Sequence, residues 1–137
     1  MNQSTNSTAS REGRPSPSRS KVLLIDDSPD ICAAVKELLE LEGLSVVTRS
    51  SGAAGLNEMK KAQYGLVLLD VNLSDMNARE ILNELQADQL LDRQPIVAFT
   101  ASPELIGKDY PGLSGIIRKP IDIVELTQKI KGYLTLH

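Results

Sequence analysis

Five residues with complementary chemistry each follow a run of apolar residues. They are Asp26 and Asp27 after "VLLI", Asp70 after "LVLL", Thr100 after "IVAF" and Lys119 after "IIR". Apolar runs of this kind are typical of strands that are buried on both faces of a parallel sheet. Ligands of such sheets bind at the carboxyl ends of the strands, so we expect the five residues to meet at one edge.

That edge would hold three carboxylates, one hydroxyl and one ammonium group. Carboxylates in close proximity repel one another, and without a counter-charge at least one of them would be protonated. Lys119 neutralises one carboxylate, and a divalent cation would neutralise more. Oxygen ligands with positions left open for water are suited to Mg²⁺. The set indicates phosphoryl transfer, with a carboxylate as nucleophile, Mg²⁺ and Lys119 stabilising the phosphoryl oxygens, and Thr100 donating a hydrogen bond.

Each residue taken alone also has a structural interpretation. Adjacent acids such as Asp26 and Asp27 are often solvated loop residues or helix caps, and Asp70 is suited to capping the helix that follows it. Thr100 is a common strand residue, and Lys119 is a common surface charge. The functional interpretation depends on the whole set, because these residues lie at the same end of the predicted strands, in chain order.

The elements that would position these residues alternate between strand and helix. Apolar runs predict strands over residues 21–26, 44–49, 65–70, 94–100 and 115–119. Helical patterns predict helices over 28–43, 51–62, 77–87 and 122–134, and at most a short helix over 102–108. This alternation predicts an α/β fold, a doubly wound, five-stranded parallel sheet with helices on both faces. The second strand ends around Arg49, where we expect no chemistry.

The predicted helices carry recognisable end signals. Ser28 is suited to capping the first helix, and Gly43 is suited to ending it. Asp122, with Glu125 three residues later, has the spacing of a capping box at the start of the last helix. An apolar stripe on that helix is predicted to face the core and comprises Ile123, Leu126, Ile130 and Leu134.

The chain divides into a tail and one domain. Residues 1–20 hold eight Ser or Thr residues and almost no apolar ones. Such a segment buries too little surface to offset the entropy of ordering it, so we expect a disordered tail. Residues 21–137 are predicted to form a single domain.

Charge and cysteine content narrow the function classes. The net charge is −3, with +2 in the tail and −5 in the remainder. A mildly acidic domain suits cations or basic partners and argues against nucleic-acid binding. The single cysteine, Cys32, excludes an internal disulfide and fits a reducing cytoplasm. Because the chain shows no membrane-length apolar run and no signal region, we expect a cytoplasmic protein without membrane contact.

The chain resembles the receiver domain of two-component response regulators. Four stretches match motifs of that family in order and at nearly the family spacing: "VLLIDDSPDI", "LVLLDVNLSD", "IVAFTA" and "IIRKP". The resemblance covers residues 21–136 and is to the single-domain type, similar to the chemotaxis response regulator. It implies the flavodoxin-like (βα)5 receiver fold.

The resemblance also implies a phosphoacceptor and a metal site. Asp70 would accept the phosphoryl group and would also bind Mg²⁺. Asp27 would bind Mg²⁺ directly, and Asp26 would bind it mainly through water. Asn72, two residues after the acceptor, would give the metal its backbone carbonyl oxygen.

Two further residues complete the catalytic set that the resemblance implies. Lys119 would pair with the phosphoryl group, and its peptide bond to Pro120 would be cis. Thr100 would move toward the phosphoryl group, which the small Ala101 leaves accessible. In this family the motion accompanies a rearrangement of the face built from the fourth helix, the fifth strand and the fifth helix, a population shift biased by a local charge.

Several positions depart from the family pattern. Ser74 and Ala78 stand where the family usually has proline and glycine, which implies a less rigid loop after the third strand. Ile116 replaces the switch aromatic three residues before the lysine, so coupled rotation of that aromatic is not expected. The segment that should form the fourth helix is short and contains Pro111, so we expect that helix to be stunted.

The resemblance implies a single-domain response regulator that catalyses only its own phosphorylation and dephosphorylation. The only histidine, His137, lies at the end of the chain and is poorly placed for a phosphorelay. The phosphoryl group would therefore come from a sensor histidine kinase, a histidine phosphotransfer protein or a small acyl phosphate. Phosphorylation would change the binding of an unidentified downstream protein, and the regulator itself would be a monomer or a weak dimer.

The residues leave alternatives open. The altered switch positions motivate a receiver-like interaction module that does not depend on phosphorylation. A haloacid-dehalogenase-like phosphatase would carry its DxDx[TV] motif after the first strand, whereas here the acceptor follows the third strand and Asn72 stands two residues later. A flavin-binding flavodoxin-like domain would need a phosphate-cradling loop after the first strand, where the acidic "DDSPD" repels phosphate.

Overall fold

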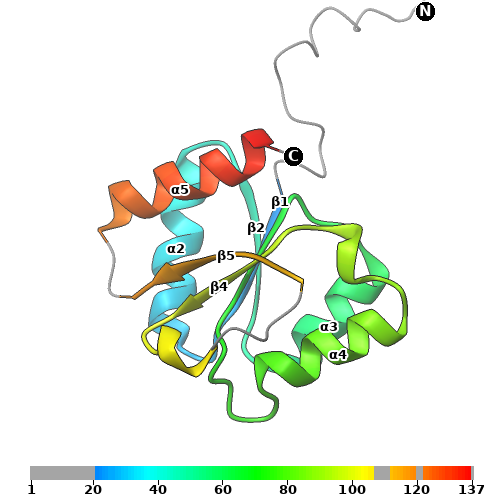
Figure 1. Ribbon diagram of the computed structural model, residues 1–137. Helices are drawn as coiled ribbons and strands as arrows, with labels where there is room; N and C mark the ends of the chain where they lie inside the picture. Colours follow the sequence, from blue (N-terminus) through cyan, green and yellow to red (C-terminus); the bar gives the residue numbers. More distant parts are fainter. Residues whose placement is uncertain (1–20, 107–111, 120–121, 137) are drawn as a thin grey trace, which may run out of the picture.

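The computed structural model describes residues 21–106, 112–119 and 122–136, which form one parallel sheet covered by helices (Figure 1). The sheet has the strand order β2-β1-β3-β4-β5. Its strands are β1 (Lys21–Ile25), β2 (Ser45–Arg49), β3 (Leu66–Leu69), β4 (Ile96–Thr100) and β5 (Leu113–Arg118). The predicted α/β class with a five-stranded parallel sheet is confirmed.

Four α-helices in the described residues cover the two faces of the sheet. They are α2 (Pro29–Leu41), α3 (Gly52–Lys61), α4 (Ala78–Ala87) and α5 (Ile123–Leu136). Two single turns of 3₁₀-helix, η1 (Leu91–Arg93) and η2 (Pro103–Leu105), flank β4. Helices α2 and α5 pack on one face, and α3 and α4 pack on the other, as Figure 1 shows. None of these helices has both the length and the apolar character that a membrane span requires.

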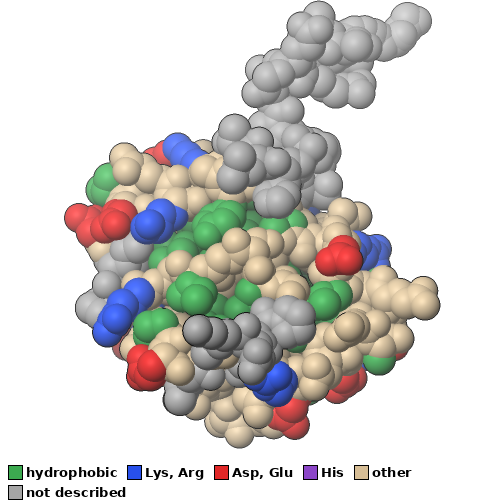
Figure 2. All heavy atoms as spheres, viewed as in Figure 1, with side chains coloured by type: hydrophobic (Ala, Val, Ile, Leu, Met, Phe, Trp, Pro, Cys, Tyr) green, Lys and Arg blue, Asp and Glu red, His purple; other side chains and the backbone are tan. Residues whose placement is uncertain are grey.

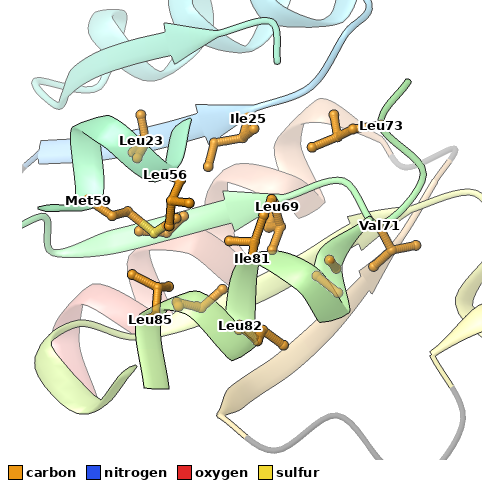
Figure 3. Packing of buried hydrophobic residues seen from close by; sticks show 14 of the residues in the cluster. Leu23, Ile25, Leu56, Met59, Leu69, Val71, Leu73, Ile81, Leu82 and Leu85 are labelled. Atoms are coloured by element: carbon orange, nitrogen blue, oxygen red, sulfur yellow. The ribbon is translucent and has the colours of Figure 1, made fainter. Parts of the chain in front are cut away.

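The core consists of two apolar layers, one on each side of the sheet. All four residues of β3 are buried, which explains the unbroken apolar run in the sequence. Figure 3 shows the layer under α3 and α4, where Ile25 and Leu69 of the sheet lie close to Leu56 and Ile81 of the helices. In the opposite layer, the predicted apolar stripe of α5 is buried at Leu126, Ile130 and Leu134. Burial of each such side chain contributes about 1.5–3 kcal/mol to stability.

The predicted helix ends are largely confirmed. Ser28 Oγ accepts a hydrogen bond from the Ile31 N–H at 3.3 Å, and Gly43 takes a φ of +87° just beyond α2. Asp122 Oδ1 accepts from the Val124 N–H at 2.8 Å at the start of α5, whereas the capping box expected with Glu125 stays a prediction. The predicted strand boundaries were less accurate. Strands β1 and β3 each end one residue before their aspartate, and β5 spans residues 113–118 rather than 115–119.

The sequence predicted at most a short helix after β4. The described part of that region forms only the single turn η2, and Pro111 lies outside the described residues, as do the tail, Pro120 and His137. Ile116, at the switch position, is 47% exposed on β5. Figure 2 shows hydrophobic side chains near the middle of the face on which β4 and β5 lie, with charged side chains around them.

Candidate metal centre

Three carboxylates gather at the carboxyl edge of the sheet. Oxygen atoms of Asp26, Asp27 and Asp70 all lie within 4.8 Å of one another. Two neighbouring strands place them there, because Ile25 of β1 pairs with Leu69 of β3 and each strand ends at that pair. The Asp70 N–H continues the pairing by donating to the Ile25 carbonyl oxygen at 2.9 Å. The structure therefore brings together the three carboxylates that the sequence predicts as metal ligands.

Asp26 is the most buried member of this cluster, with 1% of the residue exposed. Its Oδ1 accepts a hydrogen bond from the Ser28 N–H at 2.9 Å, and its Oδ2 lies 2.5 Å from Lys119 Nζ. Burial of a carboxylate is tolerated when it is paired and hydrogen-bonded in this way. Asp27, in contrast, is exposed to solvent. The two acids thus differ: one is held by the protein, and the other is open to an incoming cation.

Lys119 lies between the two buried carboxylates. Its Nζ is 2.5 Å from Asp26 Oδ2 and 3.4 Å from Asp70 Oδ2, and it sits 4.9 Å from the centroid of the Phe99 ring. Three carboxylates and one ammonium leave two formal negative charges at the edge. A divalent cation matches that charge, which supports the prediction of a metal at this position.

Asp70 is nearly buried, at 8% exposure, and both of its oxygens are oriented. Oδ1 accepts a hydrogen bond from the Asn72 N–H at 3.1 Å, while Oδ2 faces Lys119. Asn72 lies in the loop from β3 to α4 and forms an isolated antiparallel bridge with Asn77. This loop therefore carries both the predicted acceptor and the residue predicted to offer its carbonyl oxygen to the metal.

Thr100 ends β4 beside the strand that leads to Lys119. Its backbone carbonyl oxygen accepts from the Lys119 N–H at 2.8 Å, and its Oγ1 accepts from the Ser102 N–H at 3.0 Å. The residue is 1% exposed. The structure thus holds Thr100 and Lys119 next to each other at the edge where the three carboxylates lie, although their predicted roles remain predictions.

The donor set fits Mg²⁺. Every side chain of the cluster offers carboxylate oxygen, the ligand type that Mg²⁺ prefers. Octahedral Mg²⁺ has metal–oxygen distances of about 2.0–2.1 Å, so its ligand atoms are roughly 3–4 Å apart. The separations within 4.8 Å in this cluster are compatible with that geometry after a small adjustment.

A second charged cluster was missed by the sequence analysis. Arg49, to which we assigned no chemistry, lies 2.6 Å from Glu58 Oε2, and Tyr64 donates its O–H to Glu58 Oε1 at 2.7 Å. The Tyr64 hydrogen bond is the main cause that lowers the pKa of Glu58 to about 2, with Arg49 and Lys61 adding to it. Burial and Glu58 raise the pKa of Tyr64 to about 12. The available signal was Glu58, a charged residue on the buried face of α3, because a buried carboxylate needs a partner.

The family model for the response regulator receiver domain matches residues 22–131. The chain belongs to the response regulator receiver domain family. The receiver fold predicted from the four motifs is thereby confirmed, and membership of this family implies phosphoacceptor signalling.

Curated receiver-domain relatives are longer than this chain. The CpxR homolog of Haemophilus influenzae, a transcriptional regulatory protein, is 34% identical over 119 residues, which are 84% of this chain and 50% of that protein. The transcriptional regulatory protein GlrR of Escherichia coli is 31% identical over 116 residues, covering 82% of this chain and 26% of that protein. The chain thus spans about half or less of the length of these relatives.

Solved receiver structures have the same fold. The CheY-like receiver domain protein of Methanospirillum hungatei has a TM-score of 0.74 at 28% identity, covering 85% of this chain and 94% of that one. The response regulator TrrA of Thermotoga maritima, solved in complex with Mg²⁺ and BeF, has a TM-score of 0.71 at 25% identity, covering 82% of this chain and 97% of that one.

Proposed function

We propose that Asp70 accepts a phosphoryl group from a histidine kinase, a histidine phosphotransfer protein or a small acyl phosphate. One observation carries this proposal: the Asp70 carboxylate lies at the end of β3 beside both the ammonium of Lys119 and the acidic pair Asp26 and Asp27. A nucleophilic carboxylate, a fixed cation and oxygen ligands for a metal are the groups that phosphoryl transfer requires.

The transfer needs no atoms beyond those of the two reactants. A carboxylate oxygen of Asp70 bonds to phosphorus while the P–N bond of the donor phosphohistidine breaks, and the imidazole leaves with the electron pair. Lys119, 3.4 Å from Asp70 Oδ2, is placed to pair with the phosphoryl oxygens as negative charge moves onto the acceptor. Thr100 donates its hydroxyl to the phosphoryl group once it has moved toward it.

The same edge of the sheet would hold Mg²⁺. Asp27, Asp70 and the Asn72 carbonyl oxygen would hold it directly, and Asp26 would hold it through water, since both Asp26 oxygens already have protein partners. The bound cation supplies charge neutralisation and a fixed binding position for the phosphoryl oxygens. Asp26 has a further role, because it keeps Lys119 beside the acceptor.

Phosphorylation changes the binding of a partner protein. The negative charge added at Asp70 lies next to Thr100 and Lys119, the ends of β4 and β5, and it biases the packing of that side of the sheet. The exposed Ile116 on β5 offers an apolar contact there in place of the usual aromatic. Action as a monomer or weak dimer in the cytoplasm stays a prediction.

The test is intact mass measurement after incubation with acetyl phosphate and MgCl₂. We expect one phosphoryl adduct on the wild type, its loss when EDTA is present, and its loss in Asp70→Asn. Asp92→Asn, a change of the same type at an exposed aspartate in η1, serves as the control and should keep the adduct. Beryllofluoride-induced changes in the NMR spectrum cover the case of a short-lived phosphate.

Differences from the family pattern on the β4–β5 side favour a second function, partner binding that does not depend on phosphorylation. Ile116 is exposed and η2 is a single turn, so a partner could bind this side without any phosphorylation signal. If the wild type gives neither an adduct nor a beryllofluoride response, the phosphoacceptor proposal is wrong. The chain is then a receiver-shaped binding module.

A further inference from the structure

The loop between β3 and α4 lacks the proline and glycine that the family usually has there, so other contacts must fix its conformation. It carries the acceptor Asp70 and the predicted carbonyl ligand Asn72 within three residues. Ser74 and Ala78 stand at the positions where the motif usually has proline and glycine. The sequence therefore predicted a less rigid loop, and the question is what holds the Asn72 carbonyl oxygen in place.

Asp75 supplies a connection from this loop to another element. Its Oδ1 accepts a hydrogen bond from the Gly52 N–H at 2.8 Å, and its Oδ2 accepts from the Ala53 N–H at 3.0 Å. These are the first two residues of α3, whose N–H groups have no acceptor within the helix. Using both oxygens fixes the orientation of the carboxylate as well as its position. The same two bonds lower the pKa of the Asp75 carboxyl group.

The contact between the loop and α3 is close over more than one residue. A Cβ atom at Gly52 would lie 2.8 Å from Met76 Cβ and 3.2 Å from Asp75 Oδ1, distances that real side chains do not tolerate without movement. Glycine at the first position of α3 thus lets the loop backbone approach the helix. The contact involves the packing of Met76 as well as the hydrogen bonds of Asp75.

Helix α3 is itself fixed against the strand that carries the acidic pair. Gly55 packs so closely on β1 that a Cβ atom there would lie 2.4 Å from Ile25 Cδ1. Ile25 is the residue directly before Asp26. A chain of contacts therefore runs from β1 through α3 and Asp75 to the loop. It links the two groups of metal ligands, the acids after β1 and the residues after β3.

Asp70, where the loop begins, bonds to Ile25 of β1 and to Lys119, and apart from those of Asp75 the other bonds of the loop are local. Asn72 donates its N–H to Asp70, and Asn77 forms a capping box with Glu80 at the start of α4. Neither of these interactions reaches α3 or β1. Beyond Asp70, among the loop hydrogen bonds in the described part of the chain, the pair made by Asp75 ties the loop to α3.

We propose that Asp75 is a positioning residue for the metal centre: it fixes the Asn72 carbonyl oxygen relative to Asp26 and Asp27 by bonding the loop to the N-terminus of α3. This proposal rests on the proposed function, because it concerns the same Mg²⁺ site. Partners that orient metal ligands typically change metal affinity by about 10–100-fold when they are removed.

The test measures Mg²⁺ affinity of the full chain by NMR titration with MgCl₂. We expect Asp75→Ala to weaken Mg²⁺ binding about tenfold, and Asp75→Asn, which keeps one acceptor oxygen, to have an intermediate effect. At saturating Mg²⁺ the phosphorylation rate with acetyl phosphate should return to the wild-type value, since Asp75 touches neither the metal nor the phosphoryl group. If Asp75→Ala does not fold, Asp75→Asn decides the outcome.

Ser51→Ala is the matched control, because Ser51 caps the same helix at the Ala54 N–H without bonding to the loop. It should leave the Mg²⁺ affinity within about twofold of wild type, whatever it does to stability. Equal affinity in wild type and both Asp75 variants, or an equal loss in Ser51→Ala, overturns the proposal and leaves the proposed function intact. A wild type that forms no adduct and binds no Mg²⁺ overturns both.

Discussion

The ammonium of Lys119 lies 2.5 Å from Oδ2 of Asp26, a side chain that is 1% exposed. The same ammonium also faces Asp70, so Lys119 holds the Asp26 and Asp70 carboxylates close together without a metal. The site is therefore preassembled by a cation of the protein itself.

Removal of that cation should destabilise the metal-free protein. We expect Lys119→Gln to lower the free energy of unfolding by about 2–4 kcal/mol, because a buried carboxylate loses its partner. MgCl₂ should recover part of this loss by supplying positive charge at the same edge. Urea unfolding with and without MgCl₂ measures both effects.

Lys60→Gln is the control for this change. Lys60 also contacts two carboxylates, Glu84 and Asp88, but all three side chains are substantially exposed. We expect its loss to cost less than about 1 kcal/mol. Equal losses in the two variants, or no response of Lys119→Gln to MgCl₂, would contradict the preassembled site.

Glu58 should make the stability of the protein depend on pH in the acid range. Its folded pKa of about 2 lies below the ordinary value of 4.5, so its ionised form stabilises the fold above pH 4.5, and this contribution is lost as the pH falls toward 2. Between about pH 6 and pH 3 we expect the wild type to lose about 1–2 kcal/mol more than Glu58→Gln. Urea unfolding at the two pH values gives the difference, and parallel losses would show that Glu58 does not titrate in this way.

Two glycines in helices should respond oppositely to alanine. Gly55→Ala places a methyl group 2.4 Å from Ile25 Cδ1 and should cost about 1–3 kcal/mol by overpacking. Gly132→Ala, in α5 with nothing within 4 Å of the added atom, should stabilise by about 0.5–1 kcal/mol through helix propensity. Thermal unfolding compares the two. Stabilisation by Gly55→Ala would contradict the close packing of α3 on β1.

Replacement of Gln89 by glycine should stabilise the protein. It follows α4 with a φ of +61°, a conformation that costs a residue with a side chain about 1–2 kcal/mol. We expect Gln89→Gly to stabilise the protein by about 0.5–1 kcal/mol, net of the backbone entropy of glycine. Gln86→Gly, the same change inside α4, should instead cost about 1 kcal/mol. A lower melting temperature in both variants would contradict the backbone strain assigned to Gln89.

The sequence was sufficient for the features that depend on local pattern. Asp70 could be placed at the carboxyl edge because a strand buried on both faces cannot contain an unpaired charge. Ser28 could be predicted as a cap because helix starts have a short-range signature. These rules need only a few neighbouring residues, and the structure agrees with them at the strand ends to within two residues.

The features that were missed depend on residues brought together by the fold. Asp75 reaches backbone N–H groups 22 and 23 positions away, and Arg49, Glu58 and Tyr64 meet from a strand, a helix and a loop. No spacing rule links such positions, because the distances are set by how α3 packs on the sheet. The sequence also named Lys119 as one neutralising charge without indicating that it lies nearer to Asp26 than to Asp70.

The most direct test of the account is to locate the phosphorylated residue. After reaction with acetyl phosphate and Mg²⁺, borohydride reduces an aspartyl phosphate to homoserine, which peptide mass spectrometry identifies by position. The account predicts homoserine at residue 70 and at neither 26 nor 27. Homoserine at one of the other two aspartates would contradict the assignment of Asp70 as the acceptor, and its absence from all three would contradict phosphorylation of this centre.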